Sequence, residues 1–330
     1  MDKNKLPEHT KKQHFVPQFL IRKFYNSSKR LEGYSFRERK IIYPDADDIC
    51  SMNYLYEWDM VNFLNYIEKV LIKLESRINV NLNNTIDYLN SANNNKEVFV
   101  SLTEDIKEMC KYTIIQRLRM PDIINQLPQI VLKGYAEFLM EMACRENEEV
   151  RKQGLQEELK KLLKEDIEFD EKKKGADEAF LKGEGLKLLF EEDLIIEYIY
   201  NLVMSSHKVV IKKSNNFHFV SSDEPVMILG EVGEVKDMFN TSNFYLPITP
   251  NYILCLIVSN GEYDELIGDR VILQEIQEKE YEKILRNQVA QAKKLVYTDK
   301  ITKKMEDIIN EILDAKEELE KYEKGIMETV

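Results

Sequence analysis

Apolar residues recur at helical spacing over several long stretches of the chain. Between Met60 and Leu89 they recur at helical spacing, at Phe63, Ile67, Val70, Leu71, Leu74 and Ile78. An α-helix turns once in about 3.6 residues, so this spacing places them on one face and predicts a long amphipathic helix. The same kind of pattern predicts shorter helices over 101–120, 122–145, 192–206 and 274–294.

Local signals mark where some of these elements begin. Pro17 suits the first turn of a helix, where its missing N–H is not needed, and apolar residues follow it through "VPQFLIRKFY". The stretch "SLTE" is a capping box in which Ser101 and Glu104 satisfy each other's main-chain amides. Two short apolar runs around a turn predict a hairpin from Leu31 to Tyr43.

The period of the pattern changes after residue 206. Between 207 and 258 the runs "HKVVIKK", "FHFVSS", "VMIL", "NFYLPIT" and "YILCLIVS" are short, rich in β-formers and separated by Asn, Gly and Pro. They predict an antiparallel sheet. The fold class expected is α+β: a helix-rich single domain with a small antiparallel sheet built from the N-terminal hairpin and the strands in 207–258, followed by a long C-terminal amphipathic helix.

The C-terminal helix, 300–330, carries the most regular stripe in the chain. Its apolar positions are spaced alternately by four and three residues, at Ile301, Met305, Ile308, Ile312, Ala315, Leu319, Tyr322 and Ile326. This is the seam of a coiled coil, and it has to be covered. Docking on the helix 60–89 is favoured because the seam spans fewer than four heptads. A homodimer through paired tails is the alternative.

Composition indicates a folded protein without a membrane span. Hydrophobic residues make up 43% and charged residues 32% of the 330 residues. The longest apolar run, Tyr252 to Val258, is too short to cross a bilayer, and the first residues lack the apolar region of a secretory signal. We therefore expect a cytoplasmic protein with no membrane partner, whose scattered cysteines are reduced. The Lys- and Glu-rich stretch 145–185 reads as a charged helical insertion in a domain covering 13–299.

Charge is unevenly distributed along the chain. The formal net charge is −12, which argues against wrapping nucleic acid over a broad surface. Residues 1–43 nevertheless hold eleven Lys or Arg and four acids, a local charge of +7. This segment could form a phosphate-facing patch for nucleic acid or a nucleotide. It could equally be a solvated terminus whose cations pair with acidic neighbours, and both interpretations stay open.

Several common catalytic motifs are missing from the sequence. It has no P-loop, no dinucleotide-binding glycine pattern after a strand and no nucleophile elbow. Four short polar motifs stand at element boundaries instead: "HFVPQ", "QRLRMP", "FVSSDEPV" and "YLPITP". Each also has a structural explanation, because such residues cap helices and close turns.

Taken together, these motifs resemble the DUF4238 family, a microbial family of unknown function. The opening His-x-Val-Pro-Gln-Phe is the most specific match, and it continues with Leu20, Arg22 and Phe24. The glutamate-bearing helix "YIEKVLIKLES", the Gln-x-x-Arg-x-Pro end, the Ser-Asp-x-Pro-Val strand end, the Pro-x-Thr-Pro strand end and "LRNQVAQAKKLVYT" follow in order. The resemblance covers roughly 13–299. It implies that His14, Gln18, Gln116, Arg119 and Asp223 converge, without bringing a mechanism.

The first functional hypothesis is a nuclease-like phosphoester hydrolase, in a setting such as defence or a toxin. His14 would transfer protons, since an imidazole titrates near neutral pH, and Asp223 would orient it or hold a divalent ion such as Mg²⁺ or Mn²⁺. Arg119 would stabilise charge on a phosphoryl oxygen. Gln18 and Gln116 would position water or substrate. The residues expected to contact the substrate are Arg22, Lys23, Ser222 and Thr249.

The second hypothesis is a non-catalytic module that binds a ligand or partner. Here the same residues form a buried network that fixes the fold. The two hypotheses differ in one structural respect: a catalytic set lines an accessible site, whereas a structural set is buried and mutually satisfied.

Overall fold

The computed structural model describes residues 12–57, 66–94, 98–124, 194–230, 241–259 and 270–327, with residues 190 and 239. The helices are α1 (Gln18–Ile21), the 3-10 turn η1 (Arg22–Phe24), α2 (Tyr66–Asn94), α3 (Glu104–Leu118), α4 (Pro121–Ile124), α8 (Leu194–Ser206), α11 (Glu278–Gln291) and α12 (Lys303–Met327). The strands are β1 (Lys12–His14), β2 (Glu32–Ser35), β3 (Lys40–Ile42), β4 (Ser51–Asn53), β5 (Phe99–Ser101), β6 (His207–Lys213), β7 (Ser221–Ser222), β8 (Met227–Leu229), β9 (Asn243–Thr249), β10 (Tyr252–Val258), β11 (Arg270–Glu275) and β12 (Leu295–Thr298).

A six-stranded sheet in the order β5-β11-β6-β10-β9-β8 forms the centre of the fold. Its strands pair antiparallel except β11 and β6, which run parallel. The run "YILCLIV" is apolar at every position because β10 lies inside the sheet and is covered on both faces. Leu254 and Leu256 join one core cluster, whereas Ile253 and Cys255 join the other.

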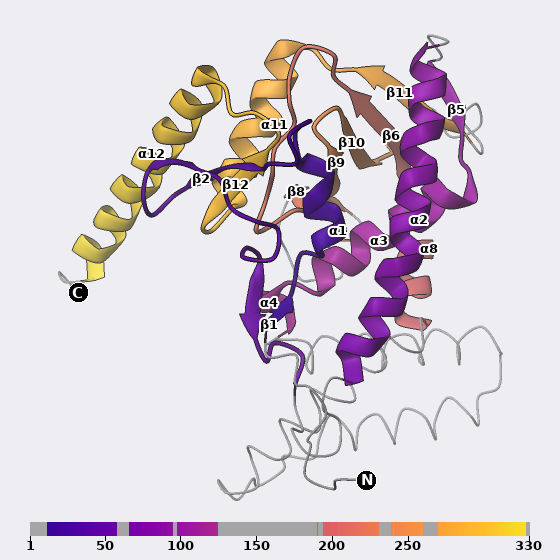
Figure 1. The fold of residues 1–330 in the computed structure, drawn as a ribbon, viewed down its shortest axis with the longest axis horizontal. Helices are drawn as coiled ribbons and strands as arrows, with labels where there is room; N and C mark the ends of the chain where they lie inside the picture. Colours follow the sequence, from indigo (N-terminus) through magenta and orange to yellow (C-terminus); the bar gives the residue numbers. More distant parts are fainter. Residues whose placement is uncertain are drawn as a thin grey trace, which may run out of the picture.

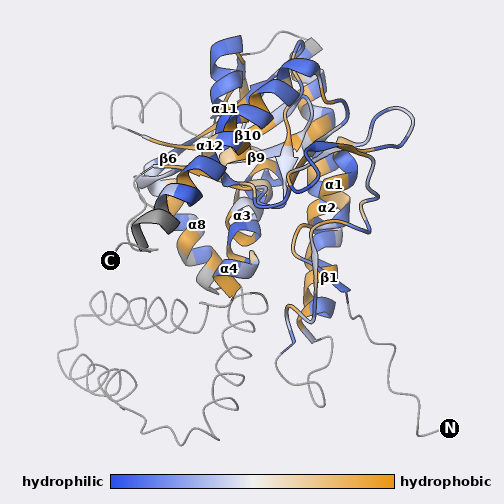
Figure 2. Ribbon diagram, turned by 90° about the vertical axis from the view of Figure 1, so that its left-hand side faces the viewer, coloured by the Kyte–Doolittle hydropathy of each residue, from blue (hydrophilic) through white to orange (hydrophobic). Residues whose placement is uncertain are grey.

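Helices cover the two faces of this sheet. Helices α2, α3 and α8 pack in sequence against one another on the first face, and α11 and α12 belong to the core of the second. Figure 1 shows α2 at one end of the long axis and α12 at the other. Apolar and polar residues alternate along α2 and α8 (Figure 2), as expected for helices with one buried face. Helix α3 lies deeper, because its residues 112–116 are all buried.

A second sheet ties the two ends of the chain together. Its order is β3-β2-β12-β7, so the expected hairpin forms, and it pairs with a strand near the C-terminus. The α+β class is confirmed. The sheet composition differs from expectation, because only β7 from the 207–258 region joins the hairpin, while the other strands of that region form the six-stranded sheet.

The expected boundaries hold in part. Helix α3 is capped by Thr103, whose Oγ1 accepts from the N–H of Ile106, and not by Ser101, which belongs to β5. The capping box was therefore placed two residues early. The predicted helix 122–145 is described only as far as residue 124, and the charged insertion 145–185 lies outside the described residues.

The C-terminal helix docks within its own chain, but not on the partner expected. Met305, Ile308, Ile309 and Leu313 are buried against α11, and Arg286 of α11 forms a bidentate pair with Glu311 at 2.9 and 2.8 Å. Docking on 60–89 was wrong, because α2 lies at the opposite end of the molecule (Figure 1). Beyond this contact Leu319 and Tyr322 are 58% and 69% exposed.

None of the helices in the described parts of the chain has the length and apolar composition needed to cross a bilayer.

Candidate functional site

A two-stranded ribbon presents His14 at its end. Strand β1 pairs with β4 so that His14 lies opposite Ser51 and Lys12 opposite Asn53. After β1 the chain stays anchored, because the N–H groups of Phe15 and Val16 both donate to the carbonyl of Cys50, at 3.0 and 3.4 Å. Cys50 adopts a φ of 56°, which turns its carbonyl toward this segment.

Gln116 holds the same segment from helix α3. Its side chain is completely buried, and its Nε2 donates to the main-chain oxygen of Phe15 at 2.8 Å. The Oε1 atom accepts from the hydroxyl of Tyr112 at 2.9 Å. Gln116 therefore positions the backbone of the opening motif, and its polar atoms are already satisfied.

Arg119 completes this clamp. Its guanidinium, 1% exposed, donates from Nη2 to the main-chain oxygen of His14 at 2.7 Å and from Nη1 to Glu75 at 2.8 Å. Its Nε donates to the hydroxyl of Tyr56 at 3.1 Å. Burial opposes the charge of Arg119, yet Tyr56 and Glu75 raise its pKa overall. The guanidinium thus bonds to groups of the protein itself. The predicted contact between Arg119 and a phosphoryl oxygen has no support in this geometry.

Glu68 is the unusual acid of the site. It lies on α2 two turns before Glu75, in the first turn of the helix as described. Burial raises the pKa of Glu68 to about 7; the positive charge of Arg119 opposes this rise, and Glu75 and Glu57 add to it. Both acids lie in the segment "YIEKVLIKLES", and neither is among the site residues predicted from the sequence. The available signal was the seven-residue spacing of Glu68 and Glu75, which places both on one helix face.

The pKa of the His14 imidazole is shifted in the opposite direction to that of Glu68. Burial and the nearby charge of Lys12 lower its pKa below the ordinary value, against the influence of Asp47 and Glu75. Its Nε2 is buried, and no hydrogen-bond partner for that atom lies among the described residues. Burial thus favours the neutral form of His14 and the protonated form of Glu68. Arg119 links the two surroundings, because it bonds to the main-chain oxygen of His14 and to Glu75.

Exposed charged and polar groups form a rim around His14. Arg22 donates to Gln18 at 2.6 Å and to Asp47 at 2.9 Å, and Lys12 pairs with Asp48 at 3.3 Å. The side chains of Arg22 and Lys12 are 51% and 45% exposed. Arg22, predicted to contact substrate, and Gln18, predicted to position water or substrate, thus bond to each other at the surface.

Lys23, the next residue, turns to the long helix instead. Its Nζ bonds to Asn83 of α2, and burial lowers its pKa. Other cations of the basic segment also have partners, because Arg39 pairs with Asp314 and Glu317 at 2.6 Å and Lys40 with Glu38 at 2.8 Å. These contacts match the interpretation of a terminus that pairs with acidic neighbours.

Asp223 belongs to a different part of the fold. Its Oδ1 accepts from the N–H of Lys293 at 3.1 Å, and the N–H groups of Lys294 and Leu295 also stabilise the carboxylate. No hydrogen bond or ion pair joins Asp223 to His14 within the described residues, so the expected orientation of His14 by Asp223 is not found. The carboxylate instead fixes the entry to β12.

Ser222 and Thr249 close turns. Ser222 accepts from the N–H of Glu224 at 2.9 Å, and Thr249 accepts from Asn251 and Tyr252 at 3.1 and 3.0 Å. These are the structural roles that Ser and Thr play at strand ends. Neither residue lies in the contacts of His14, so their expected part in substrate binding has no support here.

Within the described residues, no group of three His, Cys, Asp or Glu side chains is arranged to hold a metal ion.

Comparison with known families matches residues 12–302 to "Protein of unknown function (DUF4238)". The chain belongs to the DUF4238 family. No curated protein and no solved structure matches it.

In this DUF4238 protein the recognised motifs form two clusters. The His14 cluster joins "HFVPQ", the glutamates of α2 and the end of α3 through Gln116 and Arg119. The second cluster surrounds Glu224, whose carboxylate pairs with Arg117 at 3.1 Å and Lys293 at 2.6 Å. Burial raises the pKa of Glu224, against the effect of Lys293. Neighbouring residues on α3 therefore serve different clusters: Arg119 faces His14, and Arg117 faces Glu224.

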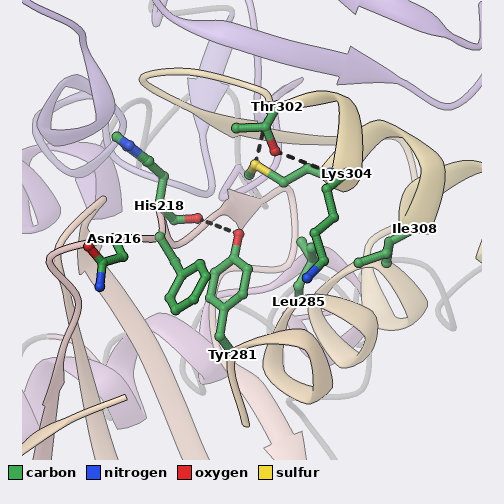
Figure 3. A pocket seen from close by; sticks show the side chains of 9 residues that line it. Asn216, His218, Tyr281, Leu285, Thr302, Lys304 and Ile308 are labelled. Atoms are coloured by element: carbon green, nitrogen blue, oxygen red, sulfur yellow. Dashed lines mark hydrogen bonds between the residues drawn. The ribbon is translucent and has the colours of Figure 1, made fainter. Parts of the chain in front are cut away.

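A small pocket of this DUF4238 protein lies away from these motifs, between the β6–β7 connection and helices α11 and α12 (Figure 3). Its volume is about 50 Å³, room for a few water molecules. Tyr281 crosses it and donates to the main-chain oxygen of His218 at 2.9 Å, while the ring of His218 contacts Asp299 at 2.7 Å. The pocket is too small to hold a nucleotide, so it does not compete with the His14 cluster as a substrate site.

Proposed function

We propose that this protein is a nuclease-like phosphoester hydrolase in which His14 acts as the general base and Glu68 as the general acid. The observation that carries the proposal is the opposite displacement of their pKa values beside the shared Arg119–Glu75 pair. Pairs of groups whose surroundings separate their pKa values in this way are typical of acid–base catalysis.

The chemistry assigns one proton to each group. Neutral His14 accepts a proton from a water molecule as its oxygen attacks phosphorus. Protonated Glu68 gives a proton to the oxygen that leaves as the phosphorus–oxygen bond breaks. Arg119 is a positioning residue, because it holds the backbone of His14 and the carboxylate of Glu75.

The rim supplies attraction for phosphate. Ion pairs between exposed side chains contribute only about 0–1 kcal/mol each, so Arg22 and Lys12 can exchange Asp47 and Asp48 for a phosphate group. Nucleic acid or a nucleotide is the partner proposed for this rim. The proposal has the protein act in the cytoplasm, where a defence or toxin role would suit such an activity.

A second candidate function has a specific observation in its favour. Gln116 and Arg119 are buried and hydrogen-bonded to main chain, which is what a structural network requires. In a non-catalytic module the rim would bind a ligand or partner, and Glu68 would take no part in a reaction. A homodimer also remains part of the proposal, through the exposed end of α12 at Leu319 and Tyr322.

The experiment that tests the proposal is a hydrolysis screen on RNA, DNA and nucleotides, with Mg²⁺, with Mn²⁺ and with neither. The proteins compared are wild type, His14→Gln, Glu68→Gln and Glu320→Gln, the last being an exposed glutamate of α12. Arg119 holds the main-chain oxygen of His14, so replacing the ring leaves that bond in place.

We expect each of the two site variants to lower the rate by roughly 100-fold or more, while Glu320→Gln matches wild type. Melting temperatures measured alongside separate lost chemistry from lost folding. Activity that survives both site variants would refute the assigned roles, and the absence of hydrolysis on every substrate would favour the non-catalytic module.

A further inference from the structure

The loop between β3 and β4 places acidic side chains on the rim. Its main chain is anchored, because Ala46 and Ile49 are buried in the core and the N–H of Ala46 donates to the hydroxyl of Tyr25 at 3.2 Å. The side chains of Asp47 and Asp48, between these two anchors, are exposed. The main chain of the loop is therefore held, whereas its carboxylates can rotate into solvent.

Two cations of the rim meet at Asp47. Arg22 donates to the carboxylate of Asp47 at 2.9 Å, and the Nζ of Lys12 donates to the main-chain oxygen of the same residue. Lys12 also pairs with the carboxylate of Asp48 at 3.3 Å. Because the bond from Lys12 to the main chain involves no carboxylate, it remains when the acidic side chains turn away. The two cations are thus brought together by the loop itself.

The same aspartate reaches the ring of His14. Burial and Lys12 lower the pKa of His14, whereas a hydrogen bond with the main chain of Asp47 and the charge of its carboxylate raise it. Asp47 therefore interacts with both cations and with the imidazole. An anion that replaced its carboxylate would lie between Arg22 and Lys12, beside the proposed general base.

The charges of the rim balance within the described residues. Lys12 and Arg22 are paired with Asp47 and Asp48, while Asp45 accepts from the hydroxyl of Tyr25 at 2.9 Å. A ligand that displaces both carboxylates restores this balance only if it brings two negative charges on neighbouring oxygens. A terminal phosphate carries a charge of about −1.5 to −2 at pH 7, whereas an internal phosphodiester carries a single negative charge.

We infer that the rim is a site for a terminal phosphate, on the end of a nucleic-acid strand or on a nucleotide, and that the carboxylate of Asp47 holds the place of this phosphate in the free protein. The inference rests on the proposed function, because it names the part of the substrate that the rim binds. The guanidinium of Arg22 suits two phosphate oxygens, and Lys12 adds a point charge.

The structure supplies a matched control for each variant. Asp47→Asn removes the carboxylate but keeps the main-chain oxygen that holds Lys12. Its control is Asp307→Asn on α12, because Asp307 is 63% exposed against 62% for Asp47 and also pairs with a cation, at 3.1 Å. Arg22→Gln removes a cation of the rim, and Arg286→Gln on α11 removes one that is paired elsewhere.

The test is fluorescence anisotropy with a single-stranded oligothymidine labelled at one end, with either a phosphate or a hydroxyl at the other. Both orientations are measured. All proteins are full chains carrying Glu68→Gln, so that hydrolysis does not consume the probe. We expect the phosphorylated strand to bind roughly 10-fold more tightly than the unphosphorylated one.

The variants should change this binding in opposite directions. Arg22→Gln should abolish the preference for the phosphorylated strand. Asp47→Asn should tighten binding of that strand by roughly 2–5-fold, which corresponds to the loss of one competing exposed ion pair. Asp307→Asn and Arg286→Gln should bind both strands as the parent protein does.

Competition separates the two sources of a terminal phosphate. If thymidine monophosphate displaces the phosphorylated strand at a similar concentration, the nucleotide is a sufficient ligand. If it needs a concentration higher by roughly 10-fold or more, the end of a strand is the ligand, and either result supports the inference. Dimethyl phosphate, a diester with a single charge, should compete much less well than inorganic phosphate.

Three results would each overturn the inference: equal binding of the two strands, equal effects of Asp47→Asn and Asp307→Asn, or equal competition by dimethyl phosphate and inorganic phosphate. Failure here is distinguishable from failure of the hydrolase proposal. A wild-type protein that hydrolyses nucleic acid without preferring the phosphorylated strand retains the activity and loses the terminal-phosphate site. A protein that shows the preference through Arg22 yet hydrolyses none of the substrates retains the site and loses the activity.

Discussion

Arg119 donates a hydrogen bond of 2.7 Å from Nη2 to the main-chain oxygen of His14, which joins the end of helix α3 to the end of strand β1. The arginine thus holds the backbone of the histidine and leaves the imidazole ring to its own surroundings. His14 and Arg119 were both predicted to be catalytic residues, yet in the structure they have different roles. Variants of the two should therefore behave differently.

Replacing Arg119 should destabilise the protein strongly. Arg119→Met would remove the donor that Arg119 supplies to the carboxylate of Glu75 and to the hydroxyl of Tyr56. It would also leave the main-chain oxygen of His14 with the Tyr56 hydroxyl at 3.2 Å in place of two donors. Removing one partner of a buried ion pair costs about 3–5 kcal/mol in the free energy of unfolding, which urea denaturation measures. Arg286→Met removes a bidentate pair with Glu311 on an exposed surface and should cost at most about 1 kcal/mol. Equal losses for the two variants would contradict the clamp assigned to Arg119.

Glu68 should make the stability of the protein depend on pH. Its pKa in the folded protein is about 7, above the ordinary value of 4.5. Between these two values the unfolded chain has lost the proton that the folded protein retains, so Glu68 lowers stability as pH rises from about 4.5 to about 7. Glu68→Gln mimics the protonated acid and should be more stable than wild type at pH 8, by roughly 1–3 kcal/mol. Urea midpoints at pH 5 and pH 8 measure this, and a variant no more stable at pH 8 than wild type would show that the acid is charged without penalty.

The pH dependence of hydrolysis should be a narrow bell. Activity should rise as His14 loses its proton, at a pH below its ordinary 6.5, because burial and Lys12 lower the pKa of the ring. It should fall as Glu68 loses its proton at about pH 7. The measurement is kcat/KM against pH in the free enzyme. A plateau that extends from pH 7 to pH 9 would contradict Glu68 as the acid.

Much of the fold follows from local pattern. The uninterrupted apolar run of β10 and the helical spacing of α2 specify their elements, because burial of those side chains has few other solutions. The cap of α3 was misplaced because Ser101 and Thr103 are both able to cap a helix. Which of them does so depends on the pairing of β5 with β11, a contact between residues that are remote in sequence.

The candidate site was harder to predict for a related reason. The motif residues His14, Gln116 and Arg119 do meet, yet the sequence carries no information on whether a polar side chain contacts main chain or faces a ligand. Glu68 looks like any acid on the polar face of an amphipathic helix. Its pKa is raised mainly by burial in the folded protein, with the charges of Glu75 and Glu57 adding to the rise. Asp223 resembles a catalytic acid at a strand end, and its partners are the main-chain amides at the entry to β12, about 70 residues later in the chain.

The apolar stripe of the C-terminal helix is another feature whose packing partner the sequence does not specify. Such a stripe indicates that one face of the helix is buried, without specifying which element packs on it. Here α11 packs on the first half of α12. Lys316 contacts the end of α11, where its Nζ donates to the carbonyls of Val289 and Ala292 at 2.9 Å, and Glu317 pairs with Arg39 at 2.6 Å.

We therefore expect two truncations to behave differently in light scattering and solubility assays. A chain ending at Thr298 loses Met305, Ile308, Ile309 and Leu313 from the core and should become insoluble. A chain ending at Glu318 keeps these residues and Lys316, loses only the end that carries Leu319 and Tyr322, and should stay folded. If the full chain is a dimer and the chain ending at Glu318 a monomer, the exposed end of α12 is the dimer contact. If both are monomers, the homodimer is refuted, and a soluble, folded chain ending at Thr298 would contradict the docking on α11.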